Sequence, residues 1–146
     1  MSTEQNKAAL VRLYEEAINK GNLAILNEIV ASEYLYHGVG GVELKGLEAF
    51  RQYIAMLRTA LPDLKFTLVN VIAEGDYAAH RFTLTGTHKG DLRGIAPTGK
   101  RVMATGNVLS RFSGGKEVEA WMEYDTLALY QQLGMMPLVG RGPAGI

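Results

Sequence analysis

The sequence predicts an α+β fold in which helices come first and long antiparallel strands follow. Apolar residues recur at helical spacing in the first part of the chain, and Pro62 stops the last of these segments. From Lys65 onward, alternating and β-branched segments separated by glycine-containing turns replace this spacing. The simplest packing of such a chain wraps a curved sheet around the helices and leaves a ligand cavity between them.

Three helices are expected in the N-terminal part. Ser2 or Thr3 caps the first helix, which Gly21 ends, and Asn22 caps a short second helix. The third helix runs over residues 47–60. Apolar residues at helical spacing mark the inner faces of the three helices: Leu10, Leu13, Tyr14, Ala17 and Ile18; Leu23, Leu26, Ile29 and Val30; Leu47, Phe50, Ile54, Leu57 and Leu61.

The segment between the second and third helices, residues 32–41, is expected to be irregular. The second half of the chain is expected to form strands, and these are residues 65–73, 77–87, 101–112 and 117–125. Hairpin turns over 74–76 and 113–116 and a Gly/Pro-containing loop over 89–99 connect them. A short last helix ends at Gly134, and residues 135–146 are expected to be a loose tail.

Composition excludes several classes of protein. The 146 residues fit one domain, residues 1–146, and 47% of them are hydrophobic, enough for a core. Lys+Arg and Asp+Glu balance at 15 each, which argues against nucleic-acid or membrane partners. Without cysteine, disulfides and thiolate chemistry are excluded. The polar N-terminus is not a signal peptide and no apolar run is long enough to cross a bilayer, so we expect a soluble cytoplasmic protein.

The acidic strand over 117–125 is the most informative segment. Alternation places Glu119, Trp121, Glu123 and Asp125 on one face and apolar residues on the other. A carboxyl beside an aromatic wall is how proteins tune a general acid/base toward neutral pH. The alternative is a charged, solvated face that holds the only tryptophan of the chain.

A series of short motifs resembles the SnoaL-like polyketide cyclases, the ester-cyclase group of the NTF2-like superfamily. The resemblance covers about residues 8 to 134, and it rests on these segments: Gly86-Thr87-His88-Lys89-Gly90, Gly94-Ile95-Ala96-Pro97-Thr98-Gly99-Lys100, Arg111-Phe112-Ser113-Gly114-Gly115-Lys116, Glu119-Ala120-Trp121-Met122-Glu123-Tyr124-Asp125 and Leu129-Tyr130-Gln131-Gln132-Leu133-Gly134. Asn19-Lys20-Gly21-Asn22 and Tyr36-His37 also fit.

The resemblance implies a cone-shaped α+β barrel with an apolar pocket, in a homodimer. It implies a polyketide-like substrate whose ring closes by intramolecular aldol condensation, without metal or cofactor. Asp125, at the end of the tryptophan-bearing strand, is implied to be the single acid and base. One carboxyl suffices, because a carbon between two carbonyls gives up its proton to a modest base and the same group then returns a proton to the aldol oxygen.

Each candidate residue has a structural alternative. Asp125 is also a good N-cap for the last helix. Glu123 either raises the pKa of Asp125 by like-charge repulsion or forms an ion pair with Arg81 or Arg111. Trp121 is a core residue, a ligand contact or both, and His37 is expected at the pocket mouth or in a structural role.

Two further candidates depend on local geometry. With a two-residue turn at Gly114-Gly115, Arg111 pairs with Val118 and faces away from Asp125; with a three-residue bulged loop it pairs with Glu117 and shares the Asp125 face. Tyr14 lies on the inner stripe of the first helix, where it lines the pocket or fills the core.

Three functions compete at this stage. The first is a cofactor-free cyclase or isomerase that uses Asp125 on a bulky apolar ketone or ester. The second is an epoxide hydrolase of the same superfamily, which needs an Asp-Arg-Asp set; Arg81 and Asp125 supply two members, but Thr83 stands where the nearby acid is expected. The third is a non-enzymatic small-molecule binder, in which Asp125 is a helix cap and the pocket is closed or apolar.

Overall fold

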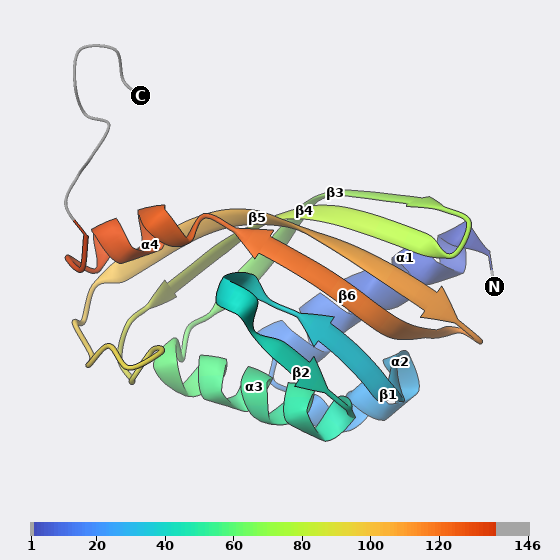
Figure 1. Ribbon diagram of the computed structural model, residues 1–146, viewed down its shortest axis with the longest axis horizontal. Coiled ribbons are helices and arrows are strands. Elements are labelled where there is room, and N and C mark those ends of the chain that lie inside the picture. The colour runs from blue at the N-terminus through green and yellow to red at the C-terminus, as the bar shows by residue number, and fades with distance from the viewer. Residues whose placement is uncertain (1, 137–146) are drawn as a thin grey trace, which may run out of the picture.

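The described part of the computed structural model, residues 2–136, folds into helices packed on one face of a curved sheet (Figure 1). The N-terminal elements are α1 (Thr3–Arg12), its π-helical continuation η1 (Leu13–Asn19), η2 (Leu23–Ile25) and α2 (Leu26–Ile29). Then come β1 (Val30–His37), η3 (Val39–Gly41), β2 (Glu43–Lys45) and α3 (Leu47–Ala60). The C-terminal elements are β3 (Lys65–Glu74), β4 (Tyr77–Thr87), β5 (Arg101–Ser113), β6 (Lys116–Tyr124) and α4 (Thr126–Gln132).

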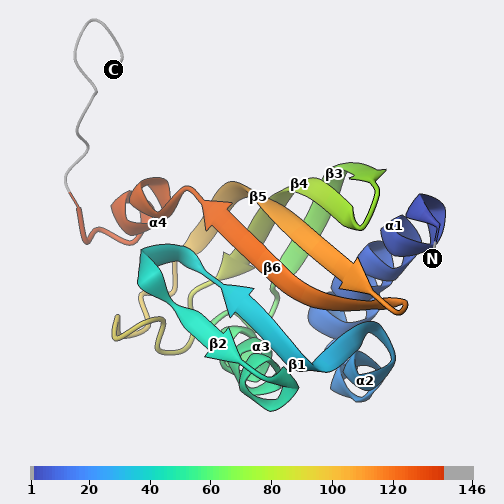
Figure 2. The same cartoon turned by 45° about the vertical axis from the view of Figure 1, so that its right-hand side comes forward.

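The sheet has six strands in the order β2-β1-β6-β5-β4-β3. Every neighbouring pair is antiparallel except β1 and β6, which run parallel (Figure 2). The long strands alternate between buried and exposed side chains, as a sheet with one covered face requires. The predicted α+β class, the third helix, the four long strands and the last helix are therefore confirmed. None of the helices within residues 2–136 is both long and apolar enough to cross a bilayer.

The prediction of an irregular segment over residues 32–41 is wrong. This part of the chain forms β1, which inserts as a strand next to β6, and β2 follows after the short turn of η3. The register with β6 shifts between Val30 and Leu35, and the buried positions of β1 do not alternate regularly. Such a strand lacks the period of two by which a sequence reveals it.

The helix ends agree with the prediction in part. Ser2 forms a capping box with Gln5, because each side chain accepts a hydrogen bond from the other residue's backbone N–H. Asn22 makes no side-chain capping bond, and the second helix is a short η2–α2 segment. The predicted tail falls mostly on residues 137–146, which lie outside the described residues.

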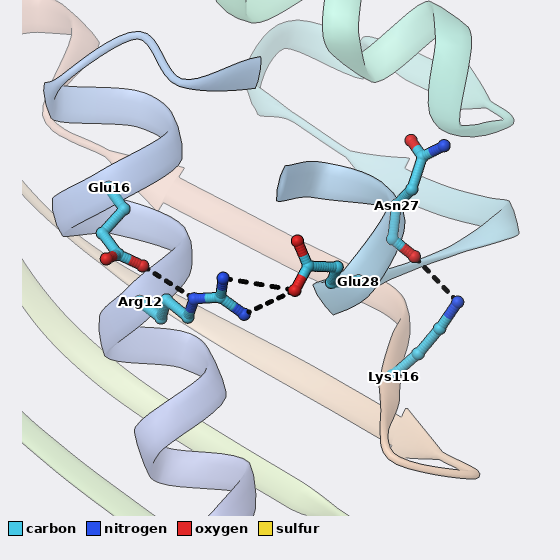
Figure 3. A network of polar contacts seen from close by, with 5 residues as sticks. All are labelled: Arg12, Glu16, Asn27, Glu28 and Lys116. Atoms are coloured by element: carbon cyan, nitrogen blue, oxygen red, sulfur yellow. Dashed lines mark hydrogen bonds and ion pairs between the residues drawn. The ribbon is translucent and has the colours of Figure 1, made fainter. Parts of the chain in front are cut away.

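A polar network ties α1 to α2 and α2 to the start of β6 (Figure 3). Arg12 donates to Glu16 at 2.7 Å and to Glu28 at 3.3 Å. Lys116 Nζ donates to the backbone carbonyl of Asn27 at 2.8 Å. These side chains are largely solvent-accessible, so each contact contributes at most about 1 kcal/mol and the network serves mainly to orient α2.

A β-bulge near the start of β6 decides which acidic residues face the core. Gly114 and Gly115, both at positive φ, form a two-residue turn in which Ser113 pairs with Lys116. Phe112 pairs with Glu117 and Arg111 with Glu119, so Val118 is the extra residue. Arg111 thus pairs with neither residue expected from the two simple turns. The bulge also turns Glu117 into the core, where its side chain is 1% exposed.

Candidate functional site

A cavity lies between the covered face of the sheet, η1 and α3. Its volume is about 50 Å³. It is lined by apolar and aromatic side chains: Tyr14, Ile18, Tyr36, Phe50, Tyr53, Ile54, Leu57, Leu61, Phe66, Phe82, Leu84, Leu92, Met122, Tyr124 and Leu129. A void of this size accommodates a few water molecules but is smaller than the cavity of about 150 Å³ that binds benzene in an engineered protein. A bulky ligand therefore enters only when lining side chains move.

Four tyrosines supply the polar groups of the cavity wall. Burial raises the pKa of Tyr14, Tyr36, Tyr53 and Tyr124 above its ordinary value. These phenols are therefore protonated at neutral pH, and each hydroxyl carries one hydrogen-bond donor. The Tyr36 hydroxyl donates to the sulfur of Met122 at 3.1 Å.

Sequence reasoning selected only Tyr14 from this group. Tyr53 lies one turn after Phe50 on the inner stripe of α3, and Tyr124 lies on the apolar face of β6, so both carried the signal of a core position. Arg93, in the loop after β4, does not line the cavity but lies beside its wall: its Nη1 lies 3.4 Å from the Tyr124 hydroxyl. Its position in a Gly/Pro-containing loop gave no periodic signal by which the sequence could place it.

Asp125 directly follows the lining residue Tyr124, but its carboxylate points to α4. Oδ1 accepts a hydrogen bond from the backbone N–H of Ala128 at 3.0 Å, which makes Asp125 the N-cap of that helix. The side chain is exposed and is not part of the cavity wall. Glu123 is also exposed, on the outer face of the sheet. The structure thus corresponds to the capping alternative for Asp125.

His37, Trp121 and Arg111 come together, but on the outer face of the sheet. The rings of His37 and Trp121 stack at a centroid distance of 5.3 Å. His37 Nε2 lies 2.7 Å from Glu119, which also accepts from Arg111 at 3.0 Å, and His37 Nδ1 lies 3.2 Å from Glu43. Hydrogen bonding to Glu119, and then to Glu43, raises the pKa of His37 above its ordinary value. This outer-face cluster ties β2, β1, β6 and β5 together and does not line the cavity.

Arg81 is exposed on β4, between the buried residues His80 and Phe82. Because neighbouring residues of a strand point to opposite faces, Arg81 projects away from the cavity. Its position therefore gives no support to an Asp-Arg-Asp arrangement with Asp125. Tyr14 is the only sequence-predicted candidate that lines the cavity within the described residues.

A second polar group lies on the covered face, beside the cavity. This buried polar cluster comprises Glu117, Tyr34, Ser110 and His80, from four adjacent strands. The Tyr34 hydroxyl donates to Glu117 Oε1 at 3.1 Å. Glu117 Oε2, the Ser110 hydroxyl and both ring nitrogens of His80 have no hydrogen-bond partner among the described residues.

Burial determines the protonation states in this cluster. It raises the pKa of the Glu117 carboxyl to about 7 and lowers the pKa of the His80 imidazole to about 4. Tyr14 adjoins both the cavity, which it lines, and the cluster, because its ring meets the His80 ring at a centroid distance of 4.6 Å. Sequence alternation missed Glu117, since only the bulge at Val118 brings it inside.

The curved sheet, the helices on one face and the aromatic cavity define a protein of the NTF2-like class. Residues 8–133 match the SnoaL-like polyketide cyclase family, and the chain belongs to that family. The predicted family is thereby confirmed.

Known relatives agree with this assignment. Over 130 residues the chain is 32% identical to the aklanonic acid methyl ester cyclase DauD of Streptomyces sp. (strain C5), covering 86% of this chain and 80% of DauD. Its identity to the aklanonic acid methyl ester cyclase DnrD of Streptomyces peucetius is also 32% over 130 residues, covering 86% of this chain and 88% of DnrD. The structure of TsrD from Streptomyces laurentii superimposes with a TM-score of 0.84 at 26% identity, covering 93% of this chain and 99% of TsrD. Family and relatives support a polyketide cyclase function.

Proposed function

We propose that this chain is a cofactor-free enzyme that closes a ring on a bulky, largely apolar ketone or ester of the polyketide type. The observation that carries the proposal is the aromatic cavity, with phenol donors in its wall, in a chain of the cyclase family. Apolar walls with a few hydrogen-bond donors suit a polycyclic ligand with carbonyl oxygens. The cyclases among its relatives act on the methyl ester of aklanonic acid, a substrate of this general kind.

The proposed reaction is an intramolecular aldol addition. A base removes a proton from the carbon between two carbonyls, the enolate carbon attacks a ketone carbon of the same molecule, and the new alkoxide takes up a proton. No atoms are gained or lost in the addition. Holding both reacting ends in one cavity lowers the barrier, because the encounter becomes unimolecular. Phenol hydroxyls stabilise the negative charge that develops on the enolate oxygen.

Asp125 is the proposed base, on the basis of the family resemblance. To act, its carboxylate has to leave the Ala128 N–H and turn past Tyr124 into the cavity, since in the structure it caps α4. Asp125→Asn tests this role, because asparagine caps a helix about as well as aspartate but cannot accept a proton from carbon. The fold is thus preserved while the proposed chemistry is removed.

The experiment measures proton removal and ring closure separately. The purified chain is incubated in D₂O with an aromatic polyketide methyl ester that carries a 1,3-dicarbonyl carbon. Exchange at that carbon is followed by NMR, and the cyclised product by chromatography. We expect the wild type to catalyse both hydrogen exchange and cyclisation. Asp125→Asn is expected to lose both activities and to keep the melting temperature of the wild type. Glu123→Gln, which removes an exposed carboxyl from β6, is the matched control.

Retained exchange in Asp125→Asn would reject Asp125 as the base and leave the ring-closing function standing. Absence of exchange and product in the wild type, with saturable binding of the ester, would instead establish the second candidate function. That function is non-enzymatic binding of a small apolar molecule. It is favoured by one observation: Asp125 is a helix cap, and no carboxylate lines the cavity within residues 2–136.

We also propose that the chain forms a homodimer through the outer face of the sheet. Tyr77, Met103 and Leu109 are exposed there, at 43%, 54% and 42%. They lie on the paired strands β4 and β5, at the positions whose side chains point away from the covered face, so they belong to one face. Sedimentation of the wild type and of Leu109→Glu tests the proposal: a dimer that the substitution splits supports it, and a wild-type monomer rejects it.

A further inference from the structure

Arg93 is held at an unusual backbone position at the open end of the cavity. Leu92 and Ile95 exchange backbone hydrogen bonds of 3.0 and 2.9 Å, so Arg93 and Gly94 form a two-residue turn. Both have positive φ, 52° and 87°. A turn with two such residues favours asparagine, aspartate or glycine at its first position, and arginine is strained there. The conformation of the turn therefore does not explain why this residue is an arginine, and we look to the contacts of its side chain for the reason.

The Arg93 guanidinium joins three segments of the chain. Nη1 lies 3.4 Å from the Tyr124 hydroxyl at the end of β6, and Nη2 lies 3.4 Å from the Val39 carbonyl in η3. Gly40 leaves room for it, since a Cβ there would lie 3.1 Å from Nη2. Tyr53 and Tyr124 are the partly exposed tyrosines of the cavity wall, so the guanidinium stands where the cavity meets solvent.

The charge of Arg93 is not neutralised by a carboxylate in the described part of the chain. Burial lowers the pKa of Arg93, but the neighbouring Tyr124, Tyr130 and Tyr53 together outweigh it and raise the pKa above its ordinary value. Burial raises the pKa of Tyr53 and Tyr124, and the positive charge of Arg93 opposes that rise in both. A guanidinium has five N–H donors, and the two contacts at 3.4 Å are long. The open end of an apolar cavity thus presents a cation with free donor capacity beside two phenol donors.

We propose that Arg93, together with the hydroxyls of Tyr53 and Tyr124, is the specificity-determining group that binds an ionised oxygen of the ligand. The ligand is then an aromatic or polycyclic molecule whose solvent-facing end carries a carboxylate, phenolate or enolate oxygen, while its apolar body fills the cavity. Guanidinium and phenol donors together form charge-assisted hydrogen bonds to such an oxygen. This inference rests on the proposed function only in that it takes the cavity as the ligand site.

Two probes with the same ring body test the inference. Binding of 2-naphthoate and of methyl 2-naphthoate is measured by calorimetry at low ionic strength. Moving the lining side chains costs the same for both probes, so their affinity ratio reports the contacts to the oxygen. We expect the wild type to bind the carboxylate about 10-fold more tightly than the ester, because hydrogen bonds to charged groups contribute that much. Arg93→Gln is expected to bring the ratio to about 1, and Arg93→Lys to keep part of it.

The control variant is Arg101→Gln, which removes an exposed arginine from the start of β5 and is expected to keep the wild-type ratio. A wild-type ratio near 1, or a preference that persists in Arg93→Gln, would overturn the inference while leaving the cavity as the ligand site. If neither probe binds the wild type or Leu57→Ala, in which the cavity is larger, the cavity is not a ligand site. The proposed function and the inference would then both be rejected.

Discussion

The buried carboxyl of Glu117 is expected to make folding stability depend on pH, and Glu117→Gln to remove that dependence. Burial raises the pKa of Glu117 from 4.5 to about 7. Between these two values the folded chain holds a proton that the unfolded chain has released. The stability that the protonated Glu117 carboxyl contributes is therefore fully present below about pH 4.5, decreases as pH rises, and is lost as the pH passes through about 7.

The magnitude follows from the two pKa values. Their difference is about 2.5 (7 − 4.5), and each pH unit corresponds to 1.36 kcal/mol, so ionisation of Glu117 lowers the free energy of unfolding by about 3 kcal/mol. This is a large fraction of the 5–15 kcal/mol that stabilises a typical domain. Burial outweighs the two hydroxyls that favour the ionised carboxyl, the nearby Ser110 hydroxyl and the Tyr34 hydroxyl, which donates at 3.1 Å.

The assay is urea unfolding of the wild type and Glu117→Gln at about pH 4.5 and about pH 8. On going to the higher pH, the wild type is expected to lose about 3 kcal/mol more than the variant. The comparison between the two chains is essential. The lowered pKa of His80 makes stability increase with pH between about 4 and 6.5, and this opposite contribution is present in both. Glu123→Gln, an exposed acid on the same strand, controls for loss of a carboxyl.

A difference between wild type and Glu117→Gln that stays constant over this pH range would refute the reasoning. It would mean that Glu117 ionises as readily in the folded chain as in the unfolded chain. The bulge at Val118 would then not bring the carboxyl into the core. A carbon-13 NMR titration of the Glu117 carboxyl then tells whether its folded-state pKa is raised, because it measures that pKa directly.

Three further predictions concern other parts of the molecule. Glu119→Gln is expected to lower the pKa of His37 toward its ordinary 6.5 in an NMR titration, because the hydrogen bond to Glu119 is the main cause of the raised pKa. The stability that charged His37 contributes is fully present below pH 6.5 and is lost as the pH rises through the folded-state pKa. An unchanged pKa of His37 in the variant would contradict this prediction. Gly106→Ala is expected to lower the free energy of unfolding in urea by about 1–3 kcal/mol, because a Cβ there would lie 2.5 Å from the Glu123 carbonyl oxygen and 2.6 Å from the Phe82 ring. An unchanged free energy of unfolding would show that the sheet can shift to make room. Met122→Ala is expected to lower the free energy of unfolding by about 2–5 kcal/mol, because Met122 is buried in the cavity wall. The same change enlarges the cavity and is expected to increase the affinity for naphthalene-sized ligands, measured by calorimetry. Weaker binding would show that ligands occupy another site.

Much of the fold could be predicted because its elements bury one face each. The stripe of α3 and the alternation of β4 and β5 are direct records of that burial, and both were identified with nearly correct bounds. β1 was missed because it lacks this regular one-sided burial: its register shift breaks the period of two. The burial of Glu117 was missed because one inserted residue, Val118, moves the preceding Glu117 to the other face of the sheet. The local sequence contains no pattern that predicts the bulge.

The candidate site was harder to predict because its residues come from segments that only the fold brings together. Tyr14 was found because it lies on a periodic stripe. His37, Trp121 and Arg111 were expected as pocket residues, but they gather on the outer face of the sheet and do not line the cavity. Arg93 comes from a loop, where neither period nor composition indicates which side chain reaches the cavity.

The register of β6 explains why the polar groups of the cavity are phenols rather than carboxylates. After the bulge, Ala120, Met122 and Tyr124 point inward, and Glu119, Trp121 and Glu123 point outward. Asp125 continues the outward series and is then used to begin α4. The same bulge brings Glu117 into the core near Tyr14, but not into the cavity wall. A ligand in the cavity therefore first meets donors, the tyrosine hydroxyls and Arg93. Any acid/base step by Asp125 requires the start of α4 to rearrange, and so catalysis and opening of the cavity are expected to be coupled.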